Sequence, residues 1–255
     1  MAPTTDGEVR RFYEKLAADY DRMTGLEKRF AQERTAFKHL IDTYHVRTAV
    51  DAGAGTGFHT LLLSELGVAV TAVDLSSAML DALRANARAR GATVEALESS
   101  FEDIPARLGG TYDAVFCMGN SLPHLLAERD LSASLKSFQA ILKAGGILCI
   151  QMLNYARILA RRERVLSAKE EGGTIYVRFY DFGGEEIGFN LLKITRTASG
   201  LATTCESVAL HPWKGEEIRA LLAGAGFSSV RLFGNVGLDP FEPATSKDLV
   251  LLAQR

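Results

Sequence analysis

The sequence predicts an α/β fold, in which a doubly wound, mostly parallel sheet carries an antiparallel β lid. Two observations lead to this prediction. Short apolar runs alternate with helical patterns over residues 48–155, which is typical of parallel strands joined by helices. After residue 155 the helices drop out, and runs with strand character follow one another across glycine turns until residue 210.

The N-terminal part begins with helices and continues with strands. Apolar residues recur at helical spacing from about residue 7 to residue 45, and they predict two helices with a break near residues 23–25. Further helices are expected over 57–66 and, after a serine cap, up to residue 90. The strands of this part are expected at 48–53, 68–74, 93–97, 112–118 and 146–153.

The later part of the chain contains the lid and the end of the sheet. Residues 157–171 are charged, and a helix is expected there, with another at 214–225. Strands are expected at 174–182, 187–197, 201–210, 228–234 and 248–254. The chain therefore divides into a core, residues 1–155 and 211–255, and a lid insert, residues 156–210.

The composition excludes several classes of protein. The 29 basic and 31 acidic residues leave a net charge of −2, which argues against a nucleic-acid partner held by bulk electrostatics. Cys117, Cys149 and Cys205 lie far apart and form no zinc motif, and the histidines have no metal spacing, so no metal is expected. The sequence has no run of 18 apolar residues and no signal peptide, which predicts a cytoplasmic protein without a membrane partner.

A glycine-rich turn follows the first expected strand. Gly53, Gly55 and Gly57 come after Asp51, and glycines at such a turn let a ligand lie against the backbone. A dinucleotide fingerprint would need a small residue at position 58, which is Phe58, and the chain has no P-loop lysine. The remaining pattern is an acid followed by three alternating glycines.

Asp74 ends the next expected strand. A carboxylate at this place can accept hydrogen bonds from both hydroxyls of a ribose. The alternative is that Asp74 only caps the helix that begins near Ser76. The glycine turn upstream favours the nucleoside site.

These two segments, VDAGAGTG and VTAVDLSSAML, resemble the first two motifs of class I S-adenosylmethionine-dependent methyltransferases. The resemblance implies a Rossmann-like sheet of seven strands, the last of them antiparallel, and S-adenosyl-L-methionine as cofactor. The cofactor-binding residues that it implies in these segments and after the fourth strand are Asp51, Gly53, Ala54, Gly55, Gly57, Asp74, Leu75, Met79, Met118, Gly119 and Asn120.

The third motif of that family corresponds to residues 98–105. Ser100 stands where the family often has an acid for the adenine amino group, and its hydroxyl could take that role. Phe101 could pack on the adenine or belong to the core. Both residues are expected in the cofactor site.

Three further segments resemble glycine/sarcosine N-methyltransferases: residues 113–125 (DAVFCMGNSLPHL), 154–159 (NYARIL) and 34–37 (RTAF). The resemblance implies that Arg34 grips the carboxylate of the methionine moiety, as an arginine fork can. By itself Arg34 would be a solvated charge on a helix. The family's acidic and basic residues just before Asn154 are replaced here by Gln151, Met152 and Leu153, so the acceptor side departs from the pattern more than the cofactor side.

The expected catalytic residues surround a small acceptor. Tyr13 and Tyr20 resemble tyrosines that close over the cofactor, and the alternative for both is helix packing. Asn154 could donate to an acceptor carboxylate or end its strand, and His124 could orient the substrate or cap a helix. Arg178, between two tyrosines of the lid, is the residue expected to bind a substrate carboxylate.

The sequence therefore predicts methyl transfer to a small-molecule amine of glycine or sarcosine type by in-line displacement, in a monomer or homodimer. Alignment and desolvation are the main tasks of the protein in such a reaction, and no strong base is needed. The alternatives are an O- or C-methyltransferase of another small metabolite, and a non-catalytic module that binds S-adenosylmethionine.

Overall fold

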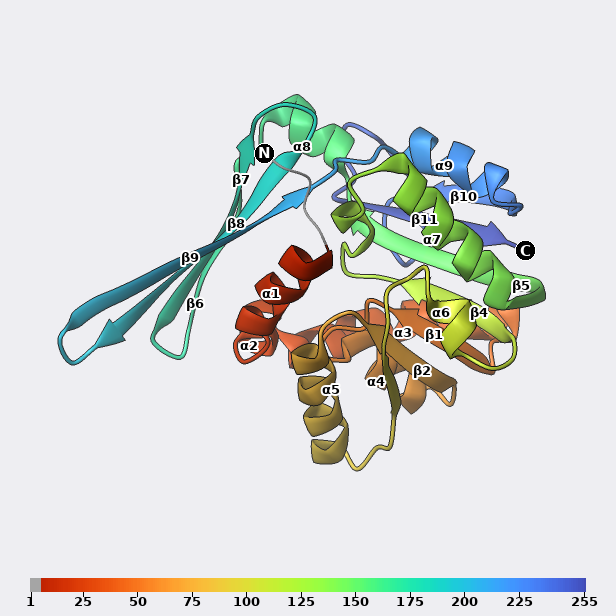
Figure 1. Cartoon of the computed structure of the whole chain (residues 1–255), viewed down its shortest axis with the longest axis horizontal. Helices are drawn as coiled ribbons and strands as arrows, with labels where there is room; N and C mark the ends of the chain where they lie inside the picture. The colour runs from red at the N-terminus through yellow and green to blue at the C-terminus, as the bar shows by residue number, and fades with distance from the viewer. Residues whose placement is uncertain (1–5) are drawn as a thin grey trace.

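A seven-stranded sheet forms the centre of the molecule. The computed structural model describes residues 6–255, apart from the side chains of residues 26–28, so part of the segment inspected for a signal peptide lies outside the described residues. The strands run in the order β10-β11-β5-β4-β1-β2-β3 (Figure 1). Their bounds are β1 (Thr48–Ala52), β2 (Ala69–Asp74), β3 (Glu95–Glu98), β4 (Tyr112–Cys117), β5 (Leu142–Leu153), β10 (Ser228–Phe233) and β11 (Asp248–Gln254). Only β11 runs antiparallel to its neighbours, which confirms the predicted fold class.

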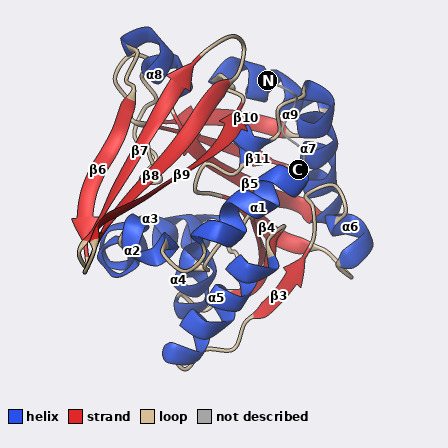
Figure 2. Cartoon of the chain, turned by 60° about the vertical axis from the view of Figure 1, so that its left-hand side comes forward, coloured by secondary structure: helices blue, strands red, loops and turns tan. Residues whose placement is uncertain are grey.

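Helices cover both faces of this sheet (Figure 2). One face packs against α6 (Ile104–Arg107), α7 (Glu128–Ile141) and α9 (Gly215–Gly224), and the other against α3 (Leu26–Tyr44), α4 (Phe58–Glu65) and α5 (Ser77–Ala89). The central strands are therefore buried on both sides. Val115 and Phe116 point to opposite faces and neither is exposed.

The N-terminal segment contains three helices instead of the expected two. They are α1 (Asp6–Leu16), α2 (Tyr20–Thr24) and α3, and the predicted break falls at Gly25, whose φ of 71° suits glycine. A second break follows Leu16. Helices α1 and α2 lie between the sheet and the lid, where Phe12 and Leu16 pack against Tyr176 of the lid (Figure 1).

The lid is an antiparallel sheet of four strands, which we call the lid sheet: β6 (Val165–Glu171), β7 (Thr174–Phe182), β8 (Ile187–Thr197) and β9 (Gly200–Leu210). The prediction of a helix over 157–171 is wrong in its second half. Helix α8 (Tyr155–Arg161) ends at residue 161, and β6 follows it. Gly172 and Gly173, with φ of 58° and 77°, form a two-residue turn that pairs β6 with β7. Strand pairing therefore overrides the local helical composition. The division of the chain at residues 155/156 and 210/211 stays a prediction.

The lid sheet returns to the core beside the loop that follows β4. The His211 N–H donates to the carbonyl of Pro123 at 2.8 Å, and the indole N–H of Trp213 donates to the carbonyl of Leu125 at 2.9 Å. The outgoing end, α8, begins directly after β5. None of the described helices is both long and apolar enough to span a bilayer.

Gly57 offers a test of how tightly α4 and α5 pack. Its φ is 94°, and an added Cβ would lie 2.6 Å from Cγ of Leu83, whereas Gly67 has a φ of 85° and open space around it. Alanine at either position costs about 1–2 kcal/mol for the left-handed backbone. We expect Gly57→Ala to lower the free energy of unfolding by about 1–3 kcal/mol more than Gly67→Ala, because only the former overpacks the core. Urea denaturation measures both, and equal losses would contradict this packing.

Candidate functional site

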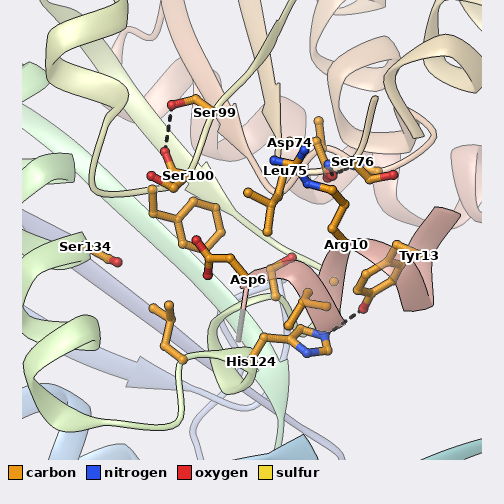
Figure 3. A pocket seen from close by; sticks show the side chains of 18 of the residues that line it. Asp6, Arg10, Tyr13, Asp74, Leu75, Ser76, Ser99, Ser100, His124 and Ser134 are labelled. Carbon is orange, nitrogen blue, oxygen red and sulfur yellow. Dashed lines mark hydrogen bonds between the residues drawn. The ribbon is translucent and has the colours of Figure 1, made fainter. Parts of the chain in front are cut away.

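A cavity of about 470 Å³ opens at the carboxyl ends of the parallel strands. Its walls come from the loops after β1, β2, β3 and β4, and α1 and α2 lie across it. The volume is in the range of small-molecule sites, and the place is the usual ligand crevice of a doubly wound sheet. Figure 3 shows Asp74, Leu75 and Ser76 on one side of the cavity and His124 across from them. The predicted residues that line it are Tyr13, Tyr20, Gly53, Ala54, Gly55, Asp74, Leu75, Ser100, Phe101, Met118, Gly119 and His124.

The glycine turn presents bare backbone to this cavity. The N–H groups of Gly53 and Ala54 donate to the carbonyl of Val73 at 2.8 and 3.0 Å, which holds the turn against β2. A Cβ at Gly53 would lie 2.5 Å from Oγ of Ser121, and one at Gly55 would lie 4.0 Å from Cε1 of Tyr20. The turn is therefore closely surrounded, and Gly53 at least cannot carry a side chain.

Asp74 is held by the backbone around it. Its two carboxylate oxygens accept from the N–H of Gly55 at 2.8 Å and from the N–H of Ser76 at 2.9 Å. The cap of α5 is Ser76 itself, whose Oγ accepts from the N–H of Met79 at 3.3 Å. Burial raises the pKa of Asp74, and the two backbone N–H groups oppose that rise. Each carboxylate oxygen keeps a free lone pair, so the group can still accept from two hydroxyls.

The loop after β3 uses its serine hydroxyl locally. Ser100 Oγ donates to Asp103 Oδ2 at 2.9 Å, although Ser100 also lines the cavity. Phe101 lies between the core and the glycine turn. Its ring centroid is 5.3 Å from that of Phe138, and its Cζ would be 3.4 Å from a Cβ at Gly53. Phe101 therefore packs on the core and also forms a wall of the cavity. The contacts of Ser100 and Phe101 with adenine stay predictions.

Tyr13 and His124 meet at one end of the cavity, where Figure 3 shows them pointing toward each other. Tyr13 OH and His124 Nε2 are 2.8 Å apart, and the ring of Tyr20 lies 6.3 Å from that of Tyr13. Burial raises the pKa of Tyr13 and lowers the pKa of His124 to about 4, so both are neutral near pH 7. His124 Nδ1 is buried and has no partner among the residues that the structure describes.

Arg34 does not reach the cavity, contrary to the prediction. Its guanidinium pairs with Glu65 at 3.0 Å, and 49% of its side chain is exposed. Arg29, five residues earlier on α3, lines the cavity instead, and its guanidinium lies 3.9 Å from the ring centroid of Phe58. Five residues turn the helix by about 140°, so Arg29 and Arg34 lie on different faces.

Asp51, Gly57 and Met79 also lie outside the cavity, where cofactor contacts were predicted. Asp51 is fully buried beneath the turn and accepts from Oγ1 of Thr60 at 2.6 Å. Burial raises its pKa. Gly57 packs against Leu83, and Met79 is 1% exposed in the cluster that joins α5 to the lid. All three support the loops that form the cavity.

The two predicted asparagines are structural as well. The amide of Asn154 donates to the carbonyls of Pro243 and Ser246, both at 2.9 Å, and the side chain is buried. Asn120 donates to the hydroxyl of Tyr155 at 2.9 Å. These partners use both amide donors of Asn154 and one of the two of Asn120, and neither asparagine lines the cavity.

Several lining residues were missed. Some lie next to predicted residues, and extending each predicted segment by one or two positions would have found them: Thr56, Phe58, His59, Ser76, Ser99, Glu102 and Ser121. Arg10 and Arg29 stand on N-terminal helices and belong to no motif. Arg10 pairs with Glu98, at the end of β3, at 3.0 Å, which fixes α1 across the cavity.

Arg178 lies on β7, on the lid face near Tyr20, and is not itself part of the cavity wall. Its Nε donates to Oγ of Ser167 at 2.8 Å. Within the described part of the chain no carboxylate pairs with it. Burial lowers the pKa of its guanidinium, while nearby Tyr20 and Tyr180 raise it.

Comparison with known proteins agrees with this geometry. Residues 49–146 match the family described as a methyltransferase domain. A glycine/sarcosine N-methyltransferase of Parasynechococcus marenigrum is 29% identical over 92% of this chain and 82% of its own length. A glycine/sarcosine/dimethylglycine N-methyltransferase of Actinopolyspora halophila is 27% identical over 91% of this chain, which spans only 40% of that relative.

The solved structures show the same fold. An S-adenosylmethionine-dependent methyltransferase from Clostridium acetobutylicum superposes with a TM-score of 0.80 over 95% of this chain and 98% of its own, at 17% identity. The matched family begins in β1 and ends in β5, and so contains the glycine turn, Asp74 and the loop after β4. The chain thus belongs to the class I S-adenosylmethionine-dependent methyltransferases, and S-adenosylmethionine is its cofactor.

Proposed function

We propose that this enzyme methylates the amine of a small amino acid of glycine or sarcosine type. The observation that carries the proposal is the half-buried guanidinium of Arg178, which has no carboxylate partner among the described residues. Partial withdrawal from water makes pairing favourable for a charged group, and a carboxylate on the acceptor would supply that partner. The relatives named above act on glycine and sarcosine, and both of these carry a carboxylate.

The residues of the cavity fit the cofactor. Gly55 leaves room for a ligand against the backbone, and Asp74 has lone pairs for two ribose hydroxyls. Phe101 offers an aromatic wall for the adenine, and Arg29 is the cation on α3 that could hold the methionine carboxylate. When bound, the cofactor supplies a methyl group on a positively charged sulfur, open to in-line displacement by an amine.

The remaining residues of the cavity orient the acceptor and exclude water. Tyr13, Tyr20 and His124 form a neutral, half-buried wall, and His124 Nδ1 has no hydrogen-bond partner among the described residues. An amine must be uncharged to react, and a neutral wall does not stabilise its protonated form. Arg178 would fix the other end of the acceptor by its carboxylate, so the two contacts together would set the direction of the amine.

The first test concerns the acceptor. For Arg178→Met we expect kcat/KM for glycine to fall about 30-fold or more, because removing one partner of a buried charge pair costs about 2–5 kcal/mol. Affinity for S-adenosylmethionine should not change. Arg164→Met is the matched control, since Arg164 is an exposed lid arginine paired with Asp181. Methyl transfer to methylamine as fast as to glycine would contradict a carboxylate-bearing acceptor.

The second test concerns the ribose contacts. Asp74→Asn should weaken binding of S-adenosylmethionine at least tenfold, since a hydrogen bond to a charged group contributes about 1.5–3 kcal/mol. Calorimetry measures this, with Asp81→Asn as the control because Asp81 is an exposed residue of α5. Unchanged affinity in Asp74→Asn would remove Asp74 from the cofactor site.

The third test compares the two arginines of α3. Arg29→Met should weaken binding of S-adenosylmethionine about tenfold or more, by the loss of a charged hydrogen bond. Arg34→Met should leave the affinity unchanged, because Arg34 pairs with Glu65 outside the cavity. If calorimetry shows weaker binding for Arg34→Met and unchanged binding for Arg29→Met, then Arg34 holds the methionine carboxylate.

A further inference from the structure

Helix α2 touches the cofactor turn, the cavity and the lid sheet with three consecutive residues. Asp19, which precedes the helix, contacts the lid sheet, Tyr20 lines the cavity, and Asp21 contacts the glycine turn. Consecutive residues of a helix point about 100° apart, so one short segment can face three partners.

Asp21 fixes the glycine turn at Thr56. One carboxylate oxygen accepts from the hydroxyl of Thr56, and the other accepts from the amide of Asn86 on α5 at 2.7 Å. The same amide donates to the carbonyl of Thr56 at 3.0 Å. Thr56 is thus held at both its side chain and its backbone, between Gly55 and Gly57.

Asp19 fixes the inner face of the lid sheet. It accepts from the hydroxyl of Tyr176 at 3.0 Å and from the ammonium of Lys193. Burial would raise the pKa of Asp19, but the hydrogen bonds from Lys193 and Tyr176 outweigh it and the pKa is lowered, so Asp19 is charged near pH 7. Tyr176 and Arg178 are two residues apart on β7 and therefore share one face of the lid sheet.

Tyr20 lies between these two anchors. Its ring is the nearest side chain to Gly55, at 4.0 Å from an added Cβ, and it interacts electrostatically with Arg178. A shift of α2 would therefore move the roof of the cofactor turn and the neighbour of Arg178 together.

We propose that Asp19 and Asp21 are positioning residues, which couple the cofactor turn to the face of the lid sheet that carries Arg178. Cofactor contacts with the turn at residues 53–56 are transmitted through Asp21 to α2, and through Asp19 to β7 and β8. The acceptor face is thereby held in place when the cofactor is bound. The inference rests on the proposed function only in taking Arg178 as the acceptor contact, and the coupling itself needs no acceptor.

Hydrogen–deuterium exchange of the full chain, with and without S-adenosylhomocysteine and with no acceptor present, tests the coupling. In the wild type we expect the ligand to slow exchange in residues 174–197 at least about fivefold, the low end of coupling between sites. In Asp21→Asn and in Asp19→Asn the ligand should still slow exchange in the turn after β1, while its effect on residues 174–197 is lost. A purely structural role would instead raise exchange equally with and without the ligand.

Two further variants keep the test decisive if an aspartate variant does not fold. Thr56→Val removes the hydroxyl that Asp21 accepts from, and Lys193→Met removes the cation at Asp19. Asp42→Asn is the matched control, because Asp42 pairs with Lys38 on the exposed side of α3. The coupling would be overturned if the ligand still slowed exchange in residues 174–197 of every variant at Asp19, Asp21, Thr56 and Lys193. It would also be overturned if the ligand did not slow exchange there in the wild type. Inactivity toward glycine would count against the proposed acceptor and leave this result untouched.

Discussion

The site depends on one close approach of backbone to backbone. The chain leaving β1 crosses β2 at Val73, whose carbonyl binds two successive N–H groups, and passes so near Ser121 that residue 53 has no space for a Cβ. Asp74 is the next residue after Val73, and it binds back to the same turn at Gly55. The groups that face the cofactor are therefore placed by peptide geometry, which is stiffer than any side-chain contact. The other walls of the cavity are arranged around this fixed point.

Charge is distributed unevenly around that fixed point. Asp74 binds to the backbone of the glycine turn, Arg29 lines the cavity from α3, and Tyr13 and His124 form an uncharged pair at one end. Water-excluding walls of this kind strengthen every remaining electrostatic contact, because the local dielectric constant is low. Under the proposed function, Arg178 would meet the carboxylate of the acceptor, and the neutral wall would not stabilise the protonated form of its amine.

Most of the sheet and half of the site could be predicted from the sequence, because both are encoded locally. A strand buried on both faces has a continuous apolar run, and a turn that needs bare backbone has glycine, as at Gly53. The wrong predictions concern residues whose structure depends on partners far away in the sequence. The strand β6 exists because β7 pairs with it, and the donors of Asn154 meet carbonyls about ninety residues further along the chain. Arg34 was misplaced because helical spacing does not tell which face of α3 meets the cavity.

The lid sheet leaves the core after β5 and rejoins it at Pro123 and Leu125, the residues that flank His124. The returning end of the insert thus lies at the rim of the cavity, and the four strands can change without altering the pairing of any core strand. The insert is therefore a separate sheet that can be exchanged without rebuilding the core sheet. The lid sheet can therefore diverge in sequence and length while the sheet that carries the glycine turn stays the same.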